Sequence, residues 1–600
     1  MAYYYQEQFN AGQLGALLRA RSDKPYYRQG CKTLKNFRPS VQGPAIKRRG
    51  SVFMHEVKDS SETVKLVEFI FSEIDSYVLE FGNTYIRFNQ GTDSVFETAQ
   101  DITGATQADP VVITYSGADN YANGDEILIE SVAGMTELNN KRYLVANVNT
   151  GSNTFELTDK DGTDIDGTGY TAYSSGGTVK EVYQITSPYS ESDLTKLKFA
   201  QIGDIMYISH PDYRPYKLSR NGATDWTLAL VDYQLGPVKD VNDTATTMMI
   251  SGSNAKGATS TWTASADTFV STDVGSVWKF SDHVNGTTHG YARMTTYTSA
   301  TVADFENQTD LSHVASATTF WNAPAWSETE GFPRAVAFHD QRLFFAGTDE
   351  SPLTVYGSVS GSFENFDSGT AAADDALQFE IAGRVNTIQW LRSDSDFLVA
   401  GTYGGLGFIE FQVGDTITPR AKIGTSFGSS DVQGIELGDR LVYAHSNNQS
   451  IYETVYDDLT FKYQSLDLND INTGILGSGL TEMRAIEQPD LAVAGVSNGD
   501  LKIISRDRLQ EVTGWYTYEF DGDVESIGVI PTTGEDRIYI VVNRTVNSVT
   551  RRYIEYIDTD EVDRYVDSSI YYSGSATRTL SGLDHLEGET VSVLGDGSYA

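Results

Sequence analysis

The sequence predicts an all-β protein, with an irregular β-propeller-like body, inserted small β-barrel or β-sandwich domains and a short N-terminal helical segment. Three observations lead to this prediction. The composition, with 35 Tyr, 27 Phe and 54 Gly against 8 Met, favours strands and turns over helices. A short strand pattern recurs along the chain, and two stretches of different composition interrupt it. At 600 residues the chain is also too long for one ordinary core.

The recurring pattern is an Asp followed by a run of apolar and aromatic residues and then a small residue or turn, as in "GDIMYISH" and "DQRLFFAG". Each run is too short for a helix and rich in residues that favour strands. The last five copies follow one another at intervals of 56, 43, 51 and 46 residues. Strand repeats of about 40–50 residues are typical of propeller blades, although no WD or kelch signature is present. The copies contain Asp204, Asp340, Asp396, Asp439, Asp490 and Asp536.

Two long interruptions are predicted to be inserted β domains. Residues 240–330 are rich in Ser, Thr and Ala and separate the first two copies of the repeat. Residues 101–183 contain four short strands joined by Gly, Asn and Asp turns, enough for a small barrel. The full division is an N-terminal docking segment with the first propeller strands (1–100), the first insert (101–183), propeller strands (184–239), the second insert (240–330), propeller blades (331–560) and the start of a C-terminal β region (561–600).

Charge is distributed unevenly along the chain. Residues 1–50 hold ten Lys and Arg and two Asp and Glu, a net of +8, whereas the whole chain has a net charge of -38. No Asp or Glu occurs between Tyr27 and Gly50. So acidic a surface argues against wrapping DNA, which needs a basic face. It is compatible with high solubility, or with a surface that nucleic acid passes without binding.

Sequence motifs for enzyme chemistry are absent. The single cysteine, Cys31, excludes a disulfide framework and a thiolate metal cluster within the chain. No nucleotide-binding glycine loop, HExxH or CxxC motif occurs. The stretch "DKDGTDIDGTG" fails the EF-hand register because Asp164 takes the glycine position and Tyr170 the position of the last Glu. We therefore predict no enzyme, no cofactor, and no catalytic or metal-ligating residue. No apolar run approaches the ~20 residues of a membrane span.

The N-terminal segment carries a family resemblance. Its motifs are Phe9 with Gly12, then Asp23, Tyr27 and Gly30, then Leu34, Asn36 and Phe37, and finally Gln42, Gly43, Arg48, Arg49 and Gly50. In this order they resemble the start of the tail nozzle family of short-tailed bacteriophages, also called tail tubular protein B or stabilisation protein. Pro44 stands where the family usually has a second glycine.

The likeness covers nearly the whole chain apart from the two inserts. It continues through seven ordered segments: 76–88, 197–220, 331–348, 356–366, 374–383, 425–445 and 581–597. The family usually extends beyond a segment such as "GLDHLEGETV", which leaves open whether the natural chain continues after residue 600. The first insert, in "NGDEILIESVAGMTELNNKRYLVANV" and "YSSGGTV", resembles the FCCH-like β-barrel. That likeness implies a plug-in module, so deleting it with a short Gly/Ser bridge is expected to preserve the fold.

The family resemblance implies a structural virion protein at the tail tip, assembled in the host cytoplasm. It implies a hexameric ring beneath the portal and adaptor rings, a platform for tail fibres and a channel through which double-stranded DNA passes without specific binding. The alternative is a propeller-type tail protein that degrades envelope glycans or binds a receptor. A glycosidase needs two facing carboxylates, and no such pair stands out among 82 acidic residues.

The sequence also suggests two sets of site residues. The segment from Pro25 to Asn36 is predicted to be a short helix capped by Ser22 or Asp23, carrying part of a basic docking patch for an acidic neighbour. The alternative, which remains open, is that these bases only fix a local loop. Acidic turns are candidates for the channel lining, although they also suit the outer wall. The docking residues are Lys32, Lys35, Arg38, Lys47, Arg48 and Arg49, and the channel residues are Asp367, Asp374, Asp375, Asp467 and Asp470.

Overall fold

The computed structural model describes the chain except residues 1–4, 73–74, 118–120, 234, 282–288, 312–315, 370–371, 383–385, 395, 415–416, 458–461, 558–563, 573–581, 596–597 and 600. The fold is all-β, as predicted, and α1 (Tyr26–Gln29) is the one α-helix in the described ranges. None of the described helices is long and apolar enough to cross a membrane.

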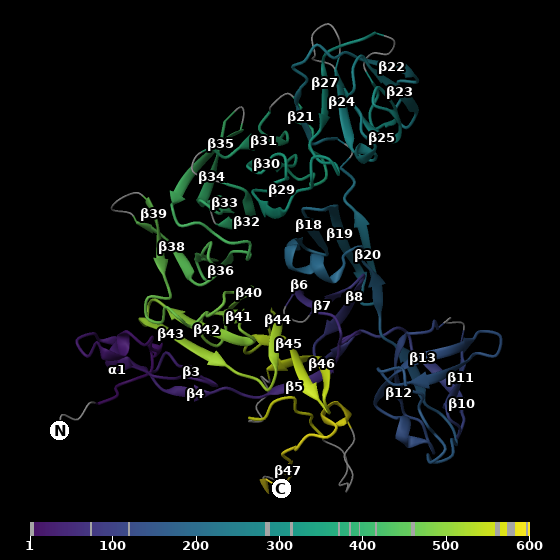
Figure 1. The fold of residues 1–600 in the computed structure, drawn as a ribbon, viewed down its shortest axis with the longest axis vertical. Helices are drawn as coiled ribbons and strands as arrows, with labels where there is room; N and C mark the ends of the chain where they lie inside the picture. The colour runs from purple at the N-terminus through teal and green to yellow at the C-terminus, as the bar shows by residue number, and fades with distance from the viewer. Residues whose placement is uncertain are drawn as a thin grey trace.

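The described strands build a β-propeller of seven four-stranded antiparallel blades around one axis (Figure 1). Strands from distant parts of the sequence complete two of these blades. Blade 1 takes its fourth strand from beyond the first insert, and blade 7 takes its fourth strand from the N-terminal region. Closing the ring with an N-terminal strand leaves no gap between the first and last blades.

Blades 1 to 7 have the following strands. Blade 1 has β6 (Lys65–Ile70), β7 (Ser76–Gly82), β8 (Tyr85–Gln90) and β16 (Gln184–Thr186), with β9 (Asp93–Ser94) beside β8, and blade 2 has β17 (Lys198–Ile202), β18 (Ile205–His210), β19 (Tyr213–Gly222) and β20 (Asp225–Leu230). Blade 3 has β28 (Ala335–His339), β29 (Arg342–Ala346), β30 (Thr354–Gly357) and β31 (Leu377–Glu380), blade 4 has β32 (Ile388–Asp394), β33 (Phe397–Thr402), β34 (Gly405–Val413) and β35 (Ile417–Thr425), and blade 5 has β36 (Ile435–Leu437), β37 (Arg440–Ala444), β38 (Ile451–Asp457) and β39 (Lys462–Asp467). Blade 6 has β40 (Glu482–Ile486), β41 (Ala492–Ser497), β42 (Asp500–Asp507) and β43 (Val512–Tyr518), and blade 7 has β44 (Asp523–Ile530), β45 (Arg537–Val546), β46 (Val549–Ile557) and β5 (Ser51–Glu56).

Apolar side chains between neighbouring blades form the core. Each of the seven blade interfaces in the described chain has its own hydrophobic cluster, including the closing interface of blades 7 and 1, where Tyr539 and Ile554 meet Leu66 and Val78. The second strand of a blade is covered on both faces, so it is a continuous apolar run. This explains the repeat, because all six predicted copies lead into second strands: β18, β29, β33, β37, β41 and β45.

The first insert is a closed six-stranded barrel with its own core, built around Ile127, Phe155 and Leu157. Its first and last strands are hydrogen-bonded neighbours, so the chain enters and leaves at one place. The sequence suggested four strands over 101–183, and the barrel has six. These are β10 (Gln100–Ala105), β11 (Val112–Ser116), β12 (Glu126–Glu130), β13 (Lys141–Asn149), β14 (Thr154–Thr158) and β15 (Thr178–Glu181), with the 3-10 turn η2 (Thr136–Leu138).

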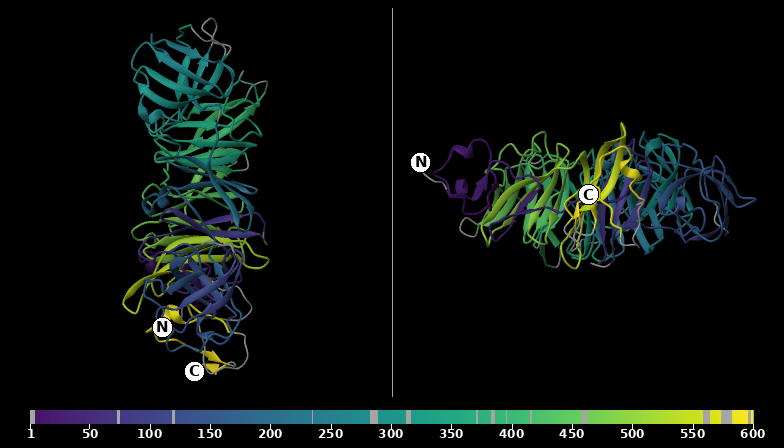
Figure 2. Two further views of the ribbon diagram at one scale, coloured as in Figure 1. Left: turned by 90° about the vertical axis from the view of Figure 1, so that its right-hand side faces the viewer. Right: turned by 90° about the horizontal axis from the view of Figure 1, so that it is seen from below.

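The second insert is one curled seven-stranded sheet, and its core surrounds Trp262, Trp278 and Phe305. It lies at the end of the long axis opposite the two termini, on a flattened body (Figure 2). Its elements are β21 (Val238–Val241), β22 (Met248–Gly252), β23 (Thr259–Ala264), η4 (Ser271–Asp273), β24 (Val277–Ser281), β25 (His289–Ser299), β26 (Val302–Asn307) and β27 (Trp321–Pro324). Another 3-10 turn, η3 (Glu191–Lys196), precedes blade 2. The C-terminal region contains η5 (Asp584–Leu586), β47 (Leu594–Gly595) and β48 (Ser598–Tyr599).

The N-terminal helix is shorter than predicted. It spans Tyr26–Gln29 rather than Pro25 to Asn36, and no side chain caps it, because Asp23 binds Arg21 instead. The helix ends at Gly30, which pairs in parallel with Gly12 and so enters a sheet. Sheet pairing therefore overrides helix propensity. The other elements of this region are β1 (Gly12–Gln13), η1 (Leu18–Ala20), β2 (Gly30–Cys31), β3 (Phe37–Pro39) and β4 (Ala45–Lys47).

Candidate functional site

The N-terminal residues 9–56, here called the clasp, bind along blades 6 and 7. Strand β1 extends blade 6 by pairing with β43, and β5 completes blade 7 by pairing with β46. Gly12 has φ +57°, and a Cβ there would lie 2.4 Å from the backbone oxygen of Trp515. A Cβ on Gly50 would lie 1.8 Å from the oxygen of Val566. Only glycine fits these two motif positions, because backbone approaches backbone there.

Arg48 holds the clasp to the C-terminal region. Its guanidinium binds both carboxylate oxygens of Asp567 at 2.7 Å and lies over the Phe520 ring, 4.5 Å from the ring centre. Its Nε donates to the side-chain oxygen of Asn36, which stands at φ 58°. The Arg48 side chain is only 6% exposed. This motif arginine therefore has an internal partner, and a bidentate pair of this kind is stronger than a surface ion pair.

The six predicted docking residues differ in their surroundings. Lys35 pairs with Glu519, and Arg38 pairs with Asp490, so both join Arg48 in binding carboxylates from distant parts of the chain. Lys32 and Lys47 are exposed, with the Lys47 ammonium 4.6 Å from the centre of the Tyr565 ring. Arg49 is half-buried. For the paired residues the structure gives a role inside the subunit. Docking of the exposed group onto a partner stays a prediction.

The predicted channel acids also differ in their surroundings. Asp367 is part of the contact with the second insert, where its carboxylate accepts a hydrogen bond from the Tyr291 hydroxyl at 2.8 Å and lies 3.3 Å from His289. Asp375 accepts a backbone hydrogen bond from Ala372, within a loop whose carbonyls bind the buried Arg342. The carboxylates of Asp367 and Asp375 are therefore used within the subunit.

The remaining acids lie nearer to solvent. Asp374 and Asp470 are exposed, while Asp467 is half-buried and accepts a hydrogen bond from the backbone N–H of Asn469 at 2.7 Å. Burial raises the pKa of Asp467. Of the five acids, Asp374 and Asp470 are thus the ones whose carboxylates face solvent. Whether they line a channel depends on neighbouring subunits and stays a prediction.

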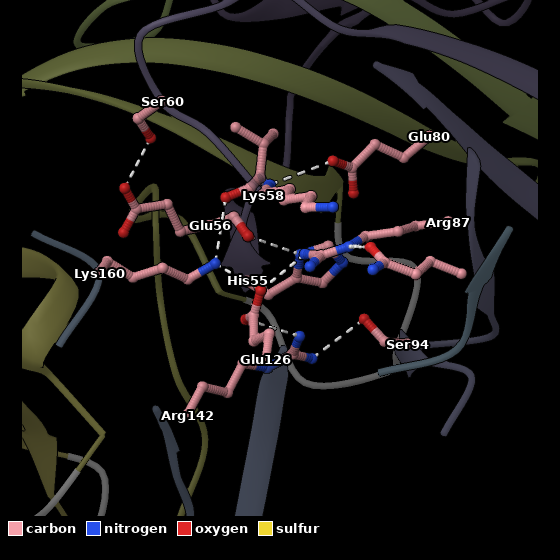
Figure 3. A network of polar contacts seen from close by, with 12 residues as sticks. His55, Glu56, Lys58, Ser60, Glu80, Arg87, Ser94, Glu126, Arg142 and Lys160 are labelled. Carbon is pink, nitrogen blue, oxygen red and sulfur yellow. Dashed lines mark hydrogen bonds and ion pairs between the residues drawn. The ribbon is translucent and has the colours of Figure 1, made fainter. Parts of the chain in front are cut away.

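A buried charged network joins the barrel to the propeller, and the sequence analysis missed it (Figure 3). At its centre is Glu126 on β12, whose side chain is fully buried. Its carboxylate binds Arg87 of blade 1 at 2.6 Å, Arg142 of β13 at 3.4 Å, and Lys160. The Arg87 side chain is 1% exposed. A signal did exist, since Arg87 interrupts the apolar strand "TYIRFN".

The charges in this network control one another's protonation. Burial opposes ionisation of Glu126, but the cationic groups of Lys160, Arg87 and Arg142 outweigh it and hold its pKa well below the ordinary value. Burial lowers the pKa of His55 on β5, and the charge of Arg142 lowers it further. His55 contacts Asn89 of blade 1 at 2.7 Å. The barrel, blade 1 and the closing strand of blade 7 therefore meet at one charged junction.

A cavity of about 650 Å³ opens beside this junction. The barrel contributes Leu128 and Tyr143 to its lining, blade 7 contributes Arg551 and Tyr553, and the C-terminal turn contributes Asp584. The Tyr143 hydroxyl is buried and has no hydrogen-bond partner in the described part of the chain. The volume lies in the range of small-molecule sites. The lining mixes aromatic rings with both signs of charge, and it does not specify one ligand class.

One group of described residues has the composition of a metal site: Asp193, His210 and Asp212. His210 is fully buried, and burial lowers its pKa to about 4, so its ring is neutral near pH 7. Its Nδ1 accepts the backbone N–H of Asp212 at 3.1 Å, which places the ring proton on Nε2, 3.8 Å from Asp193. With one nitrogen accepting and the other protonated, neither is free for a metal. The group is better explained as a structural turn.

Several solved structures match this chain, with low TM-scores and low sequence identity. The Neurospora crassa Pan2 WD40 domain has a TM-score of 0.27 and 9% identity, covering 62% of this chain and 90% of that one. YCF48 bound to D1 peptide gives 0.27 and 14%, with 61% and 92% covered. An auxiliary nutrient binding protein from Bacteroides ovatus gives 0.26 and 9%, with 77% and 99% covered. No protein-family model and no curated protein matches the chain.

The fold therefore rests on the chain's own sheet order and on the seven inter-blade clusters of its described residues. These define an all-β, propeller-like protein with a small inserted barrel and a second inserted sheet.

Proposed function

We propose that this chain is a tail nozzle subunit of a short-tailed bacteriophage. The observation that carries the proposal is where the resembling segments fall. Six of the seven lie in propeller blades, for example 76–88 in β7 and β8 and 331–348 in β28 and β29, and the last lies in the C-terminal region. The N-terminal motifs lie in the clasp. Neither insert contains one, so the likeness follows a single structural body.

The clasp supports the same proposal. Its motif residues Gly12, Arg48 and Gly50 occupy positions set by close backbone approach or by a buried ion pair. Residues of this kind are needed for one particular arrangement of clasp and blades. The positions of these residues support the proposal, because each motif residue has a specific structural role.

The mechanism proposed for the nozzle is passive. A basic bore would bind a DNA duplex, which carries one negative charge per ~1.7 Å, by counterion release. An acidic bore repels the duplex and keeps friction low, within a screening length of about 8 Å at physiological salt. The net charge of -38 supplies the required sign. Exposed acids such as Asp374 and Asp470 are the candidates for the lining.

Virions made without this chain test the proposal. Cryo-electron microscopy should show portal and adaptor density with nothing below it, and the particles should leak DNA and fail to infect. Supplying the purified chain should restore the missing density. The proposal is wrong if the tails lacking the chain look normal. Turnover of capsule or lipopolysaccharide by the purified protein, abolished by one carboxylate change, would favour the rival enzyme class.

A further inference from the structure

The first residue of β17 is a buried lysine on the innermost strand of blade 2. Lys198 is 7% exposed, and it forms no hydrogen bond or ion pair with any residue that the structure describes. A buried unpaired charge is costly, and native structures almost always give one a partner. The residues around Lys198 must therefore explain how its charge is accommodated.

A second unsatisfied polar group lies beside the lysine. Ser209 is directly opposite Lys198 in the β17–β18 ladder, so the two side chains share one face of the blade. Ser209 is fully buried, and its hydroxyl oxygen has no hydrogen-bond partner among the residues that the structure describes. Each such group in a native structure calls for an explanation. The lysine ammonium and the serine hydroxyl can both donate, and neither has an acceptor among the described residues.

The neighbouring charges do not supply the missing acceptor. Lys65, Asp431, Glu482 and Arg334 are the charged groups that act on Lys198. Glu482 already accepts from Lys65 at 2.9 Å, from the Ser526 hydroxyl and from a backbone N–H. Asp431 is exposed. Arg334, at the start of blade 3, pairs with Asp349 at 2.9 Å. The two acids and the two cations among these neighbours cancel in formal charge, so the charge of Lys198 itself has no net counterpart and suits an added anion.

We propose that Lys198 and Ser209 bind one small inorganic anion, a halide or a phosphate- or sulfate-sized oxyanion, between blades 2 and 3 near the propeller axis. The ammonium supplies the charge and the hydroxyl a second donor, which together make a charge-assisted site. The faces of these two blades pack through a shared apolar cluster that includes Tyr207, Val336 and Phe345. A bound anion would therefore strengthen one interface of the ring.

The proposed site has a pH limit. Burial lowers the pKa of Lys198 to about 8, and the positive charge of Lys65 contributes to this shift. The empty site is thus charged at pH 6.5 and neutral at pH 9.5. Anion binding should be strong at the lower pH and lost at the higher one.

Thermal unfolding tests the site directly. The unfolding midpoint is followed while chloride, bromide, phosphate or sulfate replaces gluconate at constant ionic strength, at pH 6.5 and pH 9.5. Wild type should gain a saturable increase in midpoint at pH 6.5 only. Lys198→Met should abolish that increase, and Ser209→Ala should raise the half-saturating concentration about tenfold, the loss of one hydrogen bond to a charged group. Lys422→Met, whose side chain is 65% exposed, is the matched control and should behave as wild type.

A second measurement covers the case in which Lys198→Met does not fold. Wild-type crystals soaked in bromide should show an anomalous peak within about 3.5 Å of both the Lys198 ammonium and the Ser209 hydroxyl. The proposal is overturned if wild type responds equally to all anions at constant ionic strength. It is also overturned if Lys198→Met retains the response, or if the bromide peak is absent and only water occupies the space.

Discussion

The barrel at Gln100–Glu181 and the sheet at Val238–Pro324 both interrupt the propeller, but different kinds of side chain attach them. The barrel meets blade 1 through buried charges centred on Glu126, and its apolar core contains only barrel residues. The second insert adds Val277 and Tyr291 to an apolar cluster shared with blades 2 and 3. Polar contacts, such as Tyr291 with Asp367, border that cluster.

The difference shows that an inserted module need not be an independent one. A charged junction fixes geometry strongly, but each partner depends on the others, because removal of one leaves an unpaired buried charge. An apolar junction loses area gradually when one side chain is trimmed. The two inserts should therefore respond differently to deletion, to point mutation and to pH.

Deleting the barrel should have the largest effect. The adjacent ends of β10 and β15 allow a short Gly/Ser bridge, but deletion removes Glu126 and leaves Arg87, which also contacts Gln184 and the Tyr85 ring of the propeller, without its charge partner. We expect a loss of about 3–5 kcal/mol in the free energy of unfolding, seen as a lower urea midpoint. This revises the expectation that the deletion affects stability little while it preserves the fold. Adding Arg87→Met should recover most of the loss, and equal midpoints with and without Arg87→Met would contradict the account.

Point mutation of the charged junction should come close to this effect. Glu126→Ala leaves Arg87, Arg142 and Lys160 without their shared carboxylate and should cost about 3 kcal/mol or more. Glu130→Ala is the matched control on the same strand. Its pair with Lys180 is about one-third exposed and should contribute at most about 1 kcal/mol. Similar urea midpoints for the two variants would show that the network is not a determinant of stability.

Acid should weaken the two junctions in different pH windows. The pKa of His55 is lowered by burial and by Arg142, so unfolded His55 binds a proton that the folded state excludes. Its contribution is complete above about pH 6.5 and falls below it, by at most about 1.4 kcal/mol per pH unit.

Asp367 belongs to the second junction, and its contribution also falls with falling pH, but in a more acidic window. Burial opposes its ionisation, but hydrogen bonds from His289, Gly369 and Tyr291 outweigh this and lower its pKa. Its contribution is therefore lost only below about pH 3.8. Hydrogen exchange corrected for pH should show β12 and β15 less protected at pH 5.5 than at pH 7.5, with β24 and β25 unchanged. Equal loss at both junctions would contradict this assignment.

Trimming the second junction should have a smaller effect. Tyr291→Phe removes one hydrogen bond to the Asp367 carboxylate but keeps the ring in its apolar cluster. We expect a cost of about 1.5–3 kcal/mol, the usual range for a hydrogen bond to a charged group. Tyr297→Phe, on the more exposed end of the same strand, should change the midpoint little. A larger effect of Tyr297→Phe would place the attachment elsewhere.

Charge reversal at the exposed clasp bases should have the smallest effect on stability. Lys32→Glu with Lys47→Glu changes side chains that the structure places in solvent, so the urea midpoint should stay within about 0.5 kcal/mol. Docking to the adaptor should be lost if the patch is an interface. Arg48 is excluded from this test because its substitution breaks the buried pair with Asp567. Unchanged docking at low salt would leave the clasp with an internal role only.

The sequence predicted the propeller best where strands are buried on both faces. Strand β29 reads "RLFFA" and is fully buried, so it stood out, whereas β35 alternates partly buried and exposed residues and gave no signal. A seventh copy of the repeat follows Asp75 in blade 1 and was missed. The charged Glu80 interrupts its apolar run, although the Tyr85 hydroxyl binds that carboxylate at 2.5 Å in the core.

Contacts between distant segments could not be predicted from the sequence. The pairing of β5 with β46 depends on closure of the ring, and no local pattern encodes it. The junction around Glu126 joins side chains from distant segments of the chain, and of these only Arg87 stands out in its own strand. The ion pairs of the predicted docking patch could not be predicted either, because the acidic partners of Lys35, Arg38 and Arg48 lie more than 450 residues away in the sequence.

Negative-stain electron microscopy of the purified chain, alone and mixed with its adaptor, tests the proposed function most directly. The account predicts closed rings with a central channel that stack on the adaptor, and it predicts that stacking weakens as salt increases. Single subunits at every protein concentration, with no binding to the adaptor at low salt, would contradict it.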